Sequence, residues 1–315
     1  MAYTNPPRPA GQAHRRSAAV LPSTAARSYT EETIVYANLT DLLEAADSCG
    51  SIGEAVVALE CDEAGDTRDR VLARLLEALD VMDAAIESGL TGEARSRSGL
   101  VGGDARLVAE GTEHVAGRSF AETVAAALAV GEVNAAMGRV VAAPTGGASG
   151  VLPAVLRTVG RSRGASREQL ALALAAAGGI GAIIAAKASL SGAASGCQAE
   201  IGSAAAMAAA AAAQLCGGTP AQAGHAASLA LQGLLGLVCD PIAGLVEVPC
   251  VVRNGTGAAV ALAGAEMALA GVEFPIPFDE VAAAMGAVGR SLPPSLRETA
   301  LGGLAVTPTG RTLGL

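Results

Sequence analysis

The sequence of 315 residues has few residues of several types, and each shortage weighs against a class of protein. Aromatic residues make up 2% of the chain and tryptophan is absent. Acidic residues outnumber basic ones, which gives a formal net charge of −9. A negative chain is repelled by phosphate backbones, and no strip of basic and aromatic residues offsets that repulsion. We therefore expect no nucleic-acid partner.

β-Strand signals are also scarce, because runs of Val, Ile, Tyr and Phe with alternating polarity hardly occur. The chain is 51% hydrophobic, and most of this content is alanine, the residue with the highest helix propensity. The composition predicts an all-α fold, a single large Ala/Gly-rich helical domain over residues 31–315. Thr67 is the expected N-cap of a helix with apolar periodicity over 71–82, and a further helix is expected over 120–143.

Continuous apolar segments are short. Residues 1–30 mix Pro, Arg, Ser and Ala without the apolar stretch of a secretory signal, so we predict a disordered tail. Two uncharged runs, 170–186 and 201–239, are interrupted by glycines or by a Gly-Thr-Pro turn. A spanning helix needs about 20 consecutive apolar residues. We therefore expect buried core helices, no membrane partner and a cytoplasmic location.

The six cysteines include no C-x-x-C pair and are accompanied by only three histidines, so a zinc ribbon is not indicated. Without an export signal the thiols are expected to be reduced. Cys216 is expected in the core, and Cys49 and Cys61 are expected to be structural. His225, in an apolar helix, is expected to be a hydrogen-bonded core residue rather than a ligand.

Cys197, Cys239 and Cys250 differ from these because each has Gly or Pro nearby, in "SGCQAE", "VCDPIAG" and "EVPCVVRN". A disulfide, a metal site and core packing are all open for them at this point. Thiolates with few histidines favour an iron–sulfur cluster over zinc. Three thiolates leave one iron of a [4Fe–4S] cluster without a protein ligand, and that iron can act as a Lewis acid on a substrate hydroxyl.

Several ordered motifs support a more specific hypothesis. "RSRSGLVGGDA", "VNAAMGRVVAAPTGGASGVLP", "KASLSGAASGCQAEIGSA", "CDPIAGLVEVPCVVRN" and "ETALGGLAVTPTG" together resemble the iron–sulfur-dependent L-serine dehydratase family. The resemblance covers about residues 31–310 and is to the α subunit, or to the catalytic domain of single-chain members. It implies an all-helical domain that carries a [4Fe–4S] cluster on Cys197, Cys239 and Cys250. The implied activity, in amino-acid catabolism, is deamination of L-serine to pyruvate and ammonia without pyridoxal phosphate.

The substrate carboxylate needs hydrogen-bond donors, and loops rich in Gly, Ser, Thr and Asn at helix N-termini suit this role. Ordinary helix capping explains any one such loop taken alone. We expect catalytic contacts from Lys187, Ser189 and Ser191, of which Lys187 is the only lysine of the chain. The residues expected to contact the substrate are Ser96, Ser98, Thr145, Gly146, Ser149, Arg253 and Asn254.

The chain also departs from the family pattern. It lacks the "SSHT"-like segment expected in the family's other portion, so we expect a separate β subunit, a homo-oligomer or both. Ala194 stands where a Glu is expected, and "PTGGASG" replaces "PTAGSAG", so a similar small amino acid other than L-serine stays open. Rival hypotheses are a cysteine desulfidase-like lyase, a helical membrane or scaffold protein, and a pyridoxal phosphate enzyme with Lys187 as its only candidate Schiff base.

Overall fold

The computed structural model describes residues 36–313, which fall within one compact unit. The predicted tail at 1–30, with its boundary, lies outside the described residues. Between residues 36 and 313 the regular elements are all helical, and the single β-type contact is an isolated bridge between Cys239 and Arg297. The prediction of an all-α fold in one helical domain is confirmed.

The elements follow one another with short connections. The first half contains α1 (Leu39–Cys49), α2 (Ile52–Ala64), α3 (Arg68–Leu90), α4 (Asp104–Glu110), α5 (Arg118–Ala135), α6 (Val151–Arg163) and α7 (Arg167–Lys187). The second half contains α8 (Gly192–Ser195), the π-helical turn η1 (Gln198–Gly202), α9 (Ser203–Leu215), α10 (Pro220–Gln232), the 3₁₀ turn η2 (Ile242–Gly244), α11 (Cys250–Leu269), α12 (Phe278–Ser291), the 3₁₀ turns η3 (Pro294–Leu296) and η4 (Gly303–Val306), and α13 (Pro308–Leu313).

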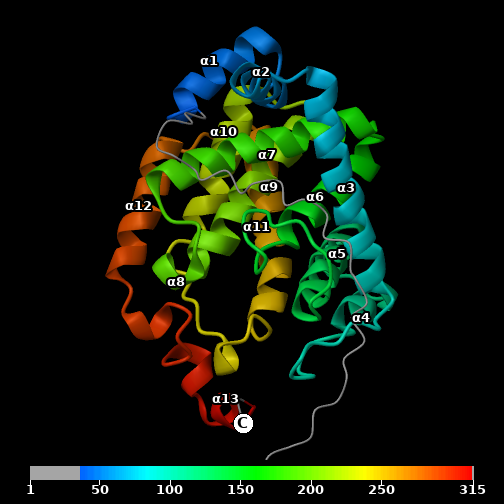
Figure 1. The fold of residues 1–315 in the computed structure, drawn as a ribbon, viewed down its shortest axis with the longest axis vertical. Coiled ribbons are helices and arrows are strands. Elements are labelled where there is room, and N and C mark those ends of the chain that lie inside the picture. The colour runs from blue at the N-terminus through cyan, green and yellow to red at the C-terminus, as the bar shows by residue number, and fades with distance from the viewer. Residues whose placement is uncertain (1–35, 314–315) are drawn as a thin grey trace, which may run out of the picture. The chain divides into compact units, whose positions relative to one another are not determined.

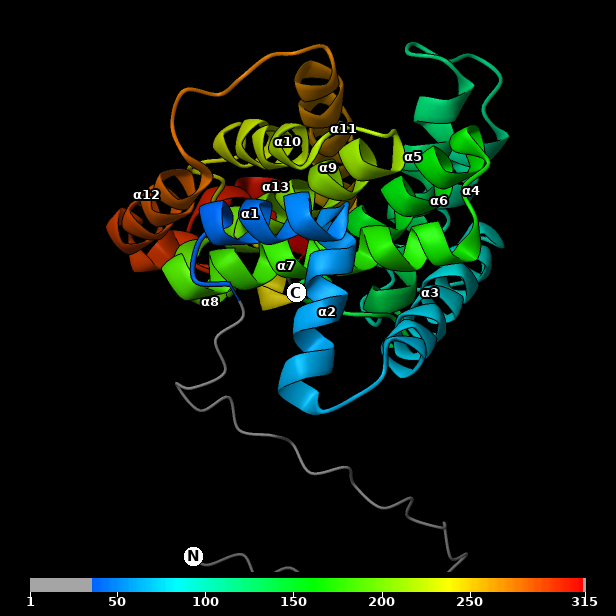
Figure 2. The same cartoon turned by 90° about the horizontal axis from the view of Figure 1, so that it is seen from above.

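The centre of the domain is α9, in which every residue from Ser203 to Ala213 is buried. It packs against α6, α7, α10 and α11, while α3 and α12 lie on opposite sides of this group (Figures 1 and 2). Alanine and glycine leave little side-chain volume between the helices, so their axes can approach closely. The alanine content that predicted helices therefore also builds the tightly packed core.

α7 contains most of the first uncharged run. It is the one helix of the described residues that is long and apolar enough to cross a membrane, and 61% of the tested window is buried. Its neighbours are α2, α3, α9 and α12. The second run, 201–239, forms α9 and α10. Both runs therefore pack as core helices, as expected.

Two helix boundaries test the sequence predictions. The Thr67 side chain accepts a hydrogen bond from the backbone N–H of Arg70, which confirms the predicted N-cap of α3. The helix predicted over 120–143 was too long, because α5 ends at Ala135. There Met137 has a φ of 62°, and the Gly138 N–H bonds back to the Val133 carbonyl at 2.8 Å, which closes the last turn.

Gly53 shows how strongly close helix packing constrains the sequence. A Cβ at Gly53 would lie 2.1 Å from the Leu172 carbonyl oxygen of α7, which is backbone and cannot turn aside. We predict that Gly53→Ala lowers the free energy of unfolding by about 1–3 kcal/mol, measured by urea denaturation. Gly178→Ala, on the exposed side of α7 with open space around the new Cβ, is the control. It should raise stability by about 0.5–1 kcal/mol through helix propensity; equal effects of both changes would contradict the packing argument.

Candidate metal centre

Three of the six cysteines converge in the structure. Cys197 directly precedes η1, Cys239 lies in the segment that follows α10, and Cys250 is the first residue of α11. Their side chains are 2%, 1% and 6% exposed. The thiols of Cys239 and Cys250 both lie within hydrogen-bonding contact of the Cys197 sulfur. Residues 42 and 53 positions apart in sequence thus meet in one buried site.

Gln198 positions Cys197 beside Cys239. Its amide nitrogen donates to the carbonyls of Ser195 and Met285, and its amide oxygen accepts from the Gly236 N–H at 2.9 Å. The backbone N–H of Gln198 donates to the Leu237 carbonyl at 3.0 Å. A fully buried side chain with these bonds fixes η1 against the segment that carries Cys239.

Arg253 and Asp240 form a buried ion pair next to the cysteines, with Arg253 Nη2 2.8 Å from Asp240 Oδ1. Arg253 Nη1 donates to the Val238 carbonyl at 2.8 Å and to the Cys197 sulfur at 3.4 Å. The other Asp240 oxygen accepts from the Leu304 N–H at 2.7 Å. The guanidinium therefore contributes positive charge directly at one of the three sulfurs.

The metal-free site favours one thiolate. Hydrogen bonds from Cys239 and Cys250, followed by the charge of Arg253, lower the pKa of Cys197 to about 3. The pKa values of Cys239 and Cys250 are raised, first by their hydrogen bonds to Cys197 and then by burial. A thiolate is the form of cysteine that binds metals.

Glu200 adds a carboxylate to this set. One of its oxygens lies with the sulfurs of Cys197 and Cys239 in a group whose ligand atoms are all within 4.8 Å of one another. Its Oε1 accepts from the Thr145 hydroxyl at 2.7 Å. Burial, followed by the charges of Cys197 and Glu298, raises the pKa of Glu200 to about 7, although the bond from Thr145 opposes the shift. Sequence reasoning missed Glu200; the spacing C-x-x-E in "SGCQAE" was the available signal.

Glu247 holds a loop that was expected to contact the substrate. It is 5% exposed and accepts from the hydroxyl of Ser96 at 2.6 Å, the backbone N–H of Ser98 at 3.3 Å and the hydroxyl of Ser98. Both serine hydroxyls are therefore turned towards Glu247. This contact joins the 96–98 loop to the turn that leads into Cys250.

Asn254 holds the second such loop. Its side chain accepts from the Gly150 N–H at 2.9 Å and donates to the Gly147 carbonyl at 2.8 Å and the Cys250 carbonyl at 3.0 Å. The loop from Thr145 to Ser149 is thereby fixed to the start of α11. The Ser149 hydroxyl is fully buried and has no hydrogen-bond partner among the described residues.

The expected catalytic residues of the third loop have other contacts. Lys187 Nζ lies 3.6 Å from the Asp279 carboxylate, which also accepts from the Leu39 N–H. The Ser189 side chain accepts from the Ser191 N–H at 3.1 Å. Within residues 36–313, no hydrogen bond or ion pair joins these three residues to the cysteines. Their catalytic role stays a prediction.

The remaining cysteines and histidines lie outside this set. Cys49 is exposed at the end of α1, Cys61 is half-buried, and Cys216 is half-buried at the C-cap of α9 rather than fully in the core. His225 is half-buried and accepts from the Phe274 N–H at 3.2 Å, in agreement with a hydrogen-bonded structural residue.

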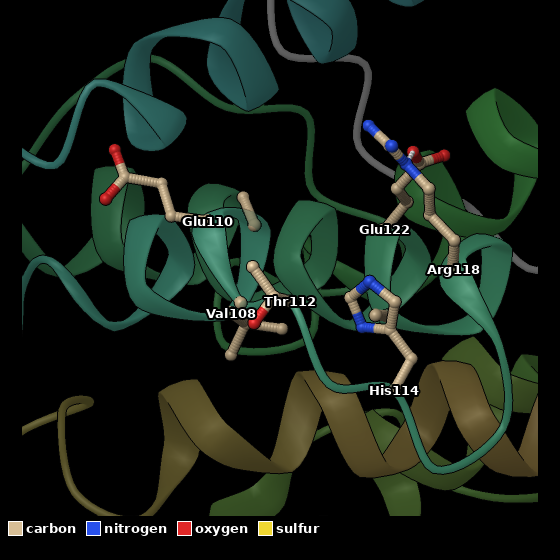
Figure 3. A pocket seen from close by; sticks show the side chains of 9 residues that line it. Val108, Glu110, Thr112, His114, Arg118 and Glu122 are labelled. Carbon is tan, nitrogen blue, oxygen red and sulfur yellow. Dashed lines mark hydrogen bonds and ion pairs between the residues drawn. The ribbon is translucent and has the colours of Figure 1, made fainter.

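A groove of about 440 Å³ lies between α4 and the start of α5 (Figure 3). It is lined by residues 108–122, among them His114 and Arg118. Arg118 lies beside Glu122, to which it donates at 2.9 Å. None of the three converging cysteines lines this groove, so it is not part of the candidate centre.

The donor set matches a metal–thiolate site. Three sulfurs converge in a buried place, a guanidinium balances part of their charge, and the nearest further donor is a carboxylate held by a hydroxyl. Soft thiolate donors select zinc, copper(I) or iron–sulfur centres over magnesium or calcium. The residues present therefore fit a thiolate-bound cluster by the chemistry of their donor atoms.

The raised pKa of Glu200 predicts a pH effect on metal-free protein. Burial of the charged form is unfavourable, so stability is fully present below the unfolded pKa of 4.5 and is lost as the pH rises towards about 7. Glu200→Gln removes this loss. Relative to the unsubstituted chain, the variant should gain roughly 2–3 kcal/mol in unfolding free energy between pH 4.5 and pH 8.

Urea denaturation of chelator-treated protein at the two pH values measures this gain. Glu122→Gln, at an exposed carboxylate on α5, is the control and should change stability by less than about 0.5 kcal/mol at both. A pH-independent effect of Glu200→Gln would contradict the burial argument.

The sequence also matches known proteins. A family model described as serine dehydratase alpha chain matches residues 48–305. The probable L-serine dehydratase alpha chain of Bacillus subtilis is 46% identical over 265 residues, which cover 83% of this chain and 88% of that protein. The L-serine dehydratase alpha chain of Peptoniphilus asaccharolyticus is 42% identical over 277 residues, which cover 86% and 95%.

A longer relative adds a comparison of length. The L-serine dehydratase of Streptomyces coelicolor is 39% identical over 274 residues, which cover 84% of this chain and 60% of that protein. The matched region contains all three converging cysteines, Glu200 and Arg253. The family model and two relatives covered over most of their length agree, and the chain belongs to the serine dehydratase alpha chain family.

Proposed function

We propose that this chain is the α subunit of an iron–sulfur L-serine dehydratase, which converts L-serine to pyruvate and ammonia. The observation that carries the proposal is the convergence of Cys197, Cys239 and Cys250 with Arg253 in one buried site of a chain from this family. The names of the relatives supply the substrate. L-serine, or a similar small amino acid, is the proposed ligand.

A [4Fe–4S] cluster on Cys197, Cys239 and Cys250 would supply a Lewis acid that makes the substrate hydroxyl a better leaving group. The chain's own residues prepare the site for it. Arg253 stabilises the Cys197 thiolate, and Gln198 and Asp240 fix the two segments that carry Cys197 and Cys239. The N-terminus of α11 presents its positive dipole end at Cys250, which further favours a thiolate there.

Substrate contacts would come from the loops that surround the cysteines. Glu247 and Asn254 hold the loops 96–98 and 145–149 in place, so backbone N–H groups and the buried Ser149 hydroxyl are available as donors to a carboxylate. Arg253 is proposed to act mainly on Cys197, because its guanidinium is already bound to Asp240. Lys187, paired with Asp279, is proposed as a contact only if that pair opens.

A second chain completes the proposed enzyme. This chain covers 60% of the single-chain Streptomyces coelicolor relative, whereas it covers nearly all of the relatives named as alpha chains. We infer that a β subunit supplies the remaining portion, and with it the base that removes the Cα proton. All six cysteines are free, which fits a reducing compartment, and we place the enzyme in the cytoplasm.

Removal of single cysteines tests the centre. Protein purified without oxygen should contain about four irons and four acid-labile sulfides per chain. We expect Cys197→Ala, Cys239→Ala and Cys250→Ala each to lose the cluster, because each removes a thiolate ligand. Cys216→Ala, half-buried at the end of α9, is the matched control and should keep it. Full iron content in any of the first three variants would refute the ligand assignment.

The activity is tested with the loaded protein and L-serine. We expect pyruvate and ammonia in equal amounts when the chain corresponding to the missing portion is present, and little or none without it. L-cysteine is the second substrate to test, since release of sulfide at a higher rate would favour a desulfidase-like lyase. Absence of pyruvate from the loaded two-chain enzyme would reject the proposed reaction.

A further inference from the structure

We propose that Glu200 is the fourth protein ligand of the metal centre, binding through its carboxylate the iron that the three cysteines leave without a thiolate when no substrate is bound. The inference rests on the proposed function, because it requires the cluster. It concerns a residue for which neither the family resemblance nor the relatives' names suggest a role.

Position is the first argument. Glu200 has a carboxylate oxygen within 4.8 Å of the sulfurs of both Cys197 and Cys239, and these three residues form a group of potential metal ligands. The π-helical turn η1 begins just after Cys197 and includes Glu200. Such widened turns occur frequently at functional sites. The ligand atoms of the first cysteine and of Glu200 are thereby brought to the same side of the chain.

Orientation is the second argument. Glu200 Oε1 accepts from the Thr145 hydroxyl, whereas Oε2 has no hydrogen-bond donor among the described residues. Oε2 faces Gly192, where a Cβ would lie 2.4 Å from Oε2 and 3.3 Å from the Cys239 sulfur. Gly192 therefore lets the carboxylate lie against the backbone next to Cys239. Carboxylates that bind metals are themselves held by hydrogen bonds, as Thr145 holds this one.

Charge is the third argument. Glu200 forms no ion pair in the described part of the chain, and the charged groups that act on it are Cys197 and Glu298, both negative. The nearby cation, Arg253, is bound to Asp240 and to the Cys197 sulfur. A buried carboxylate needs a compensating charge or a metal. A metal ion between Glu200 and the two sulfurs would provide it.

The supply of donors is the fourth argument. Cys49, Cys61 and Cys216 lie on α1, on α2 and at the end of α9, away from the converging sulfurs, so no other thiol of the chain is placed to bind the fourth iron. An oxygen ligand is also one that a substrate oxygen can replace. Glu200 would thus protect the exposed iron and leave it when L-serine arrives.

Controlled oxidation tests this ligand. A one-electron oxidant such as ferricyanide takes one electron from a [4Fe–4S]²⁺ cluster, which then releases one iron as Fe²⁺ and leaves [3Fe–4S]⁺. The released iron is measured with a chelating dye, and the remaining cluster by electron paramagnetic resonance. We expect Glu200→Gln, loaded without oxygen, to release its iron at least about tenfold faster than the unsubstituted protein. Glu200→Asp, which keeps the charge but shortens the reach, should also release it faster.

Glu298→Gln is the matched control. Glu298 also lies close enough to Cys197 for that charge to raise its pKa, yet it is not in the group with the sulfurs. It should release iron at the unsubstituted rate. Equal rates for Glu200→Gln and the unsubstituted protein, or equal acceleration in Glu298→Gln, would overturn the inference. Circular dichroism of the metal-free variants shows whether they fold, and a folding defect confined to Glu200→Gln leaves the Asp variant to decide.

The two proposals fail differently. If the unsubstituted protein binds no cluster, the proposed function fails and the role of Glu200 fails with it. If the cluster forms and iron release is the same in both Glu200 variants and the unsubstituted protein, only the role of Glu200 is rejected.

Discussion

The arrangement of the site depends on the buried ion pair between Asp240 and Arg253. Arg253 lies one helical turn after Cys250, so its position fixes the start of α11. Its guanidinium reaches Cys197 and the Val238 carbonyl, and Asp240 reaches the Leu304 N–H. One pair thus joins α11, both other cysteine-bearing segments and the C-terminal segment. Loss of one member of such a pair leaves a buried charge uncompensated, typically at about 3–5 kcal/mol.

The C-terminal segment has its own place in this arrangement. The Cys239 N–H donates to the Leu296 carbonyl and the Glu298 N–H donates to the Cys239 carbonyl, at 2.9 and 2.7 Å. A Cβ at Gly303 would lie 2.2 Å from an Asp240 oxygen, so the backbone can approach the ion pair only because residue 303 is glycine. In Figure 1 the loop before α11 lies beside this segment. The motif "ETALGGLAVTPTG" therefore belongs to the structure that supports the cysteines.

How far the sequence could predict the structure follows from the range of each interaction. Helices and their alanine-rich core depend on composition and local periodicity, so the all-α fold was accessible. The early end of α5 depends on the positive φ of Met137, which no local rule favours for methionine. Glu247 meets Ser96 across 151 positions, and Thr145 meets Glu200 across 55, so these partners appear only when the chain is folded. Lys187 was prominent as the single lysine, yet its amine pairs with Asp279.

The charges around the cysteines favour a cation over an anionic cofactor. Cys197 in its thiolate form, Glu200, Asp240 and Glu298 surround the site, whereas Arg253 is the cation that the contacts place there. A phosphate-bearing cofactor such as pyridoxal phosphate would meet net negative charge and would find Lys187 engaged elsewhere. Metal ions relieve the repulsion among these groups, so metal binding and the ordering of the site should stabilise each other. The charges therefore favour a metal-dependent lyase even without reference to the relatives.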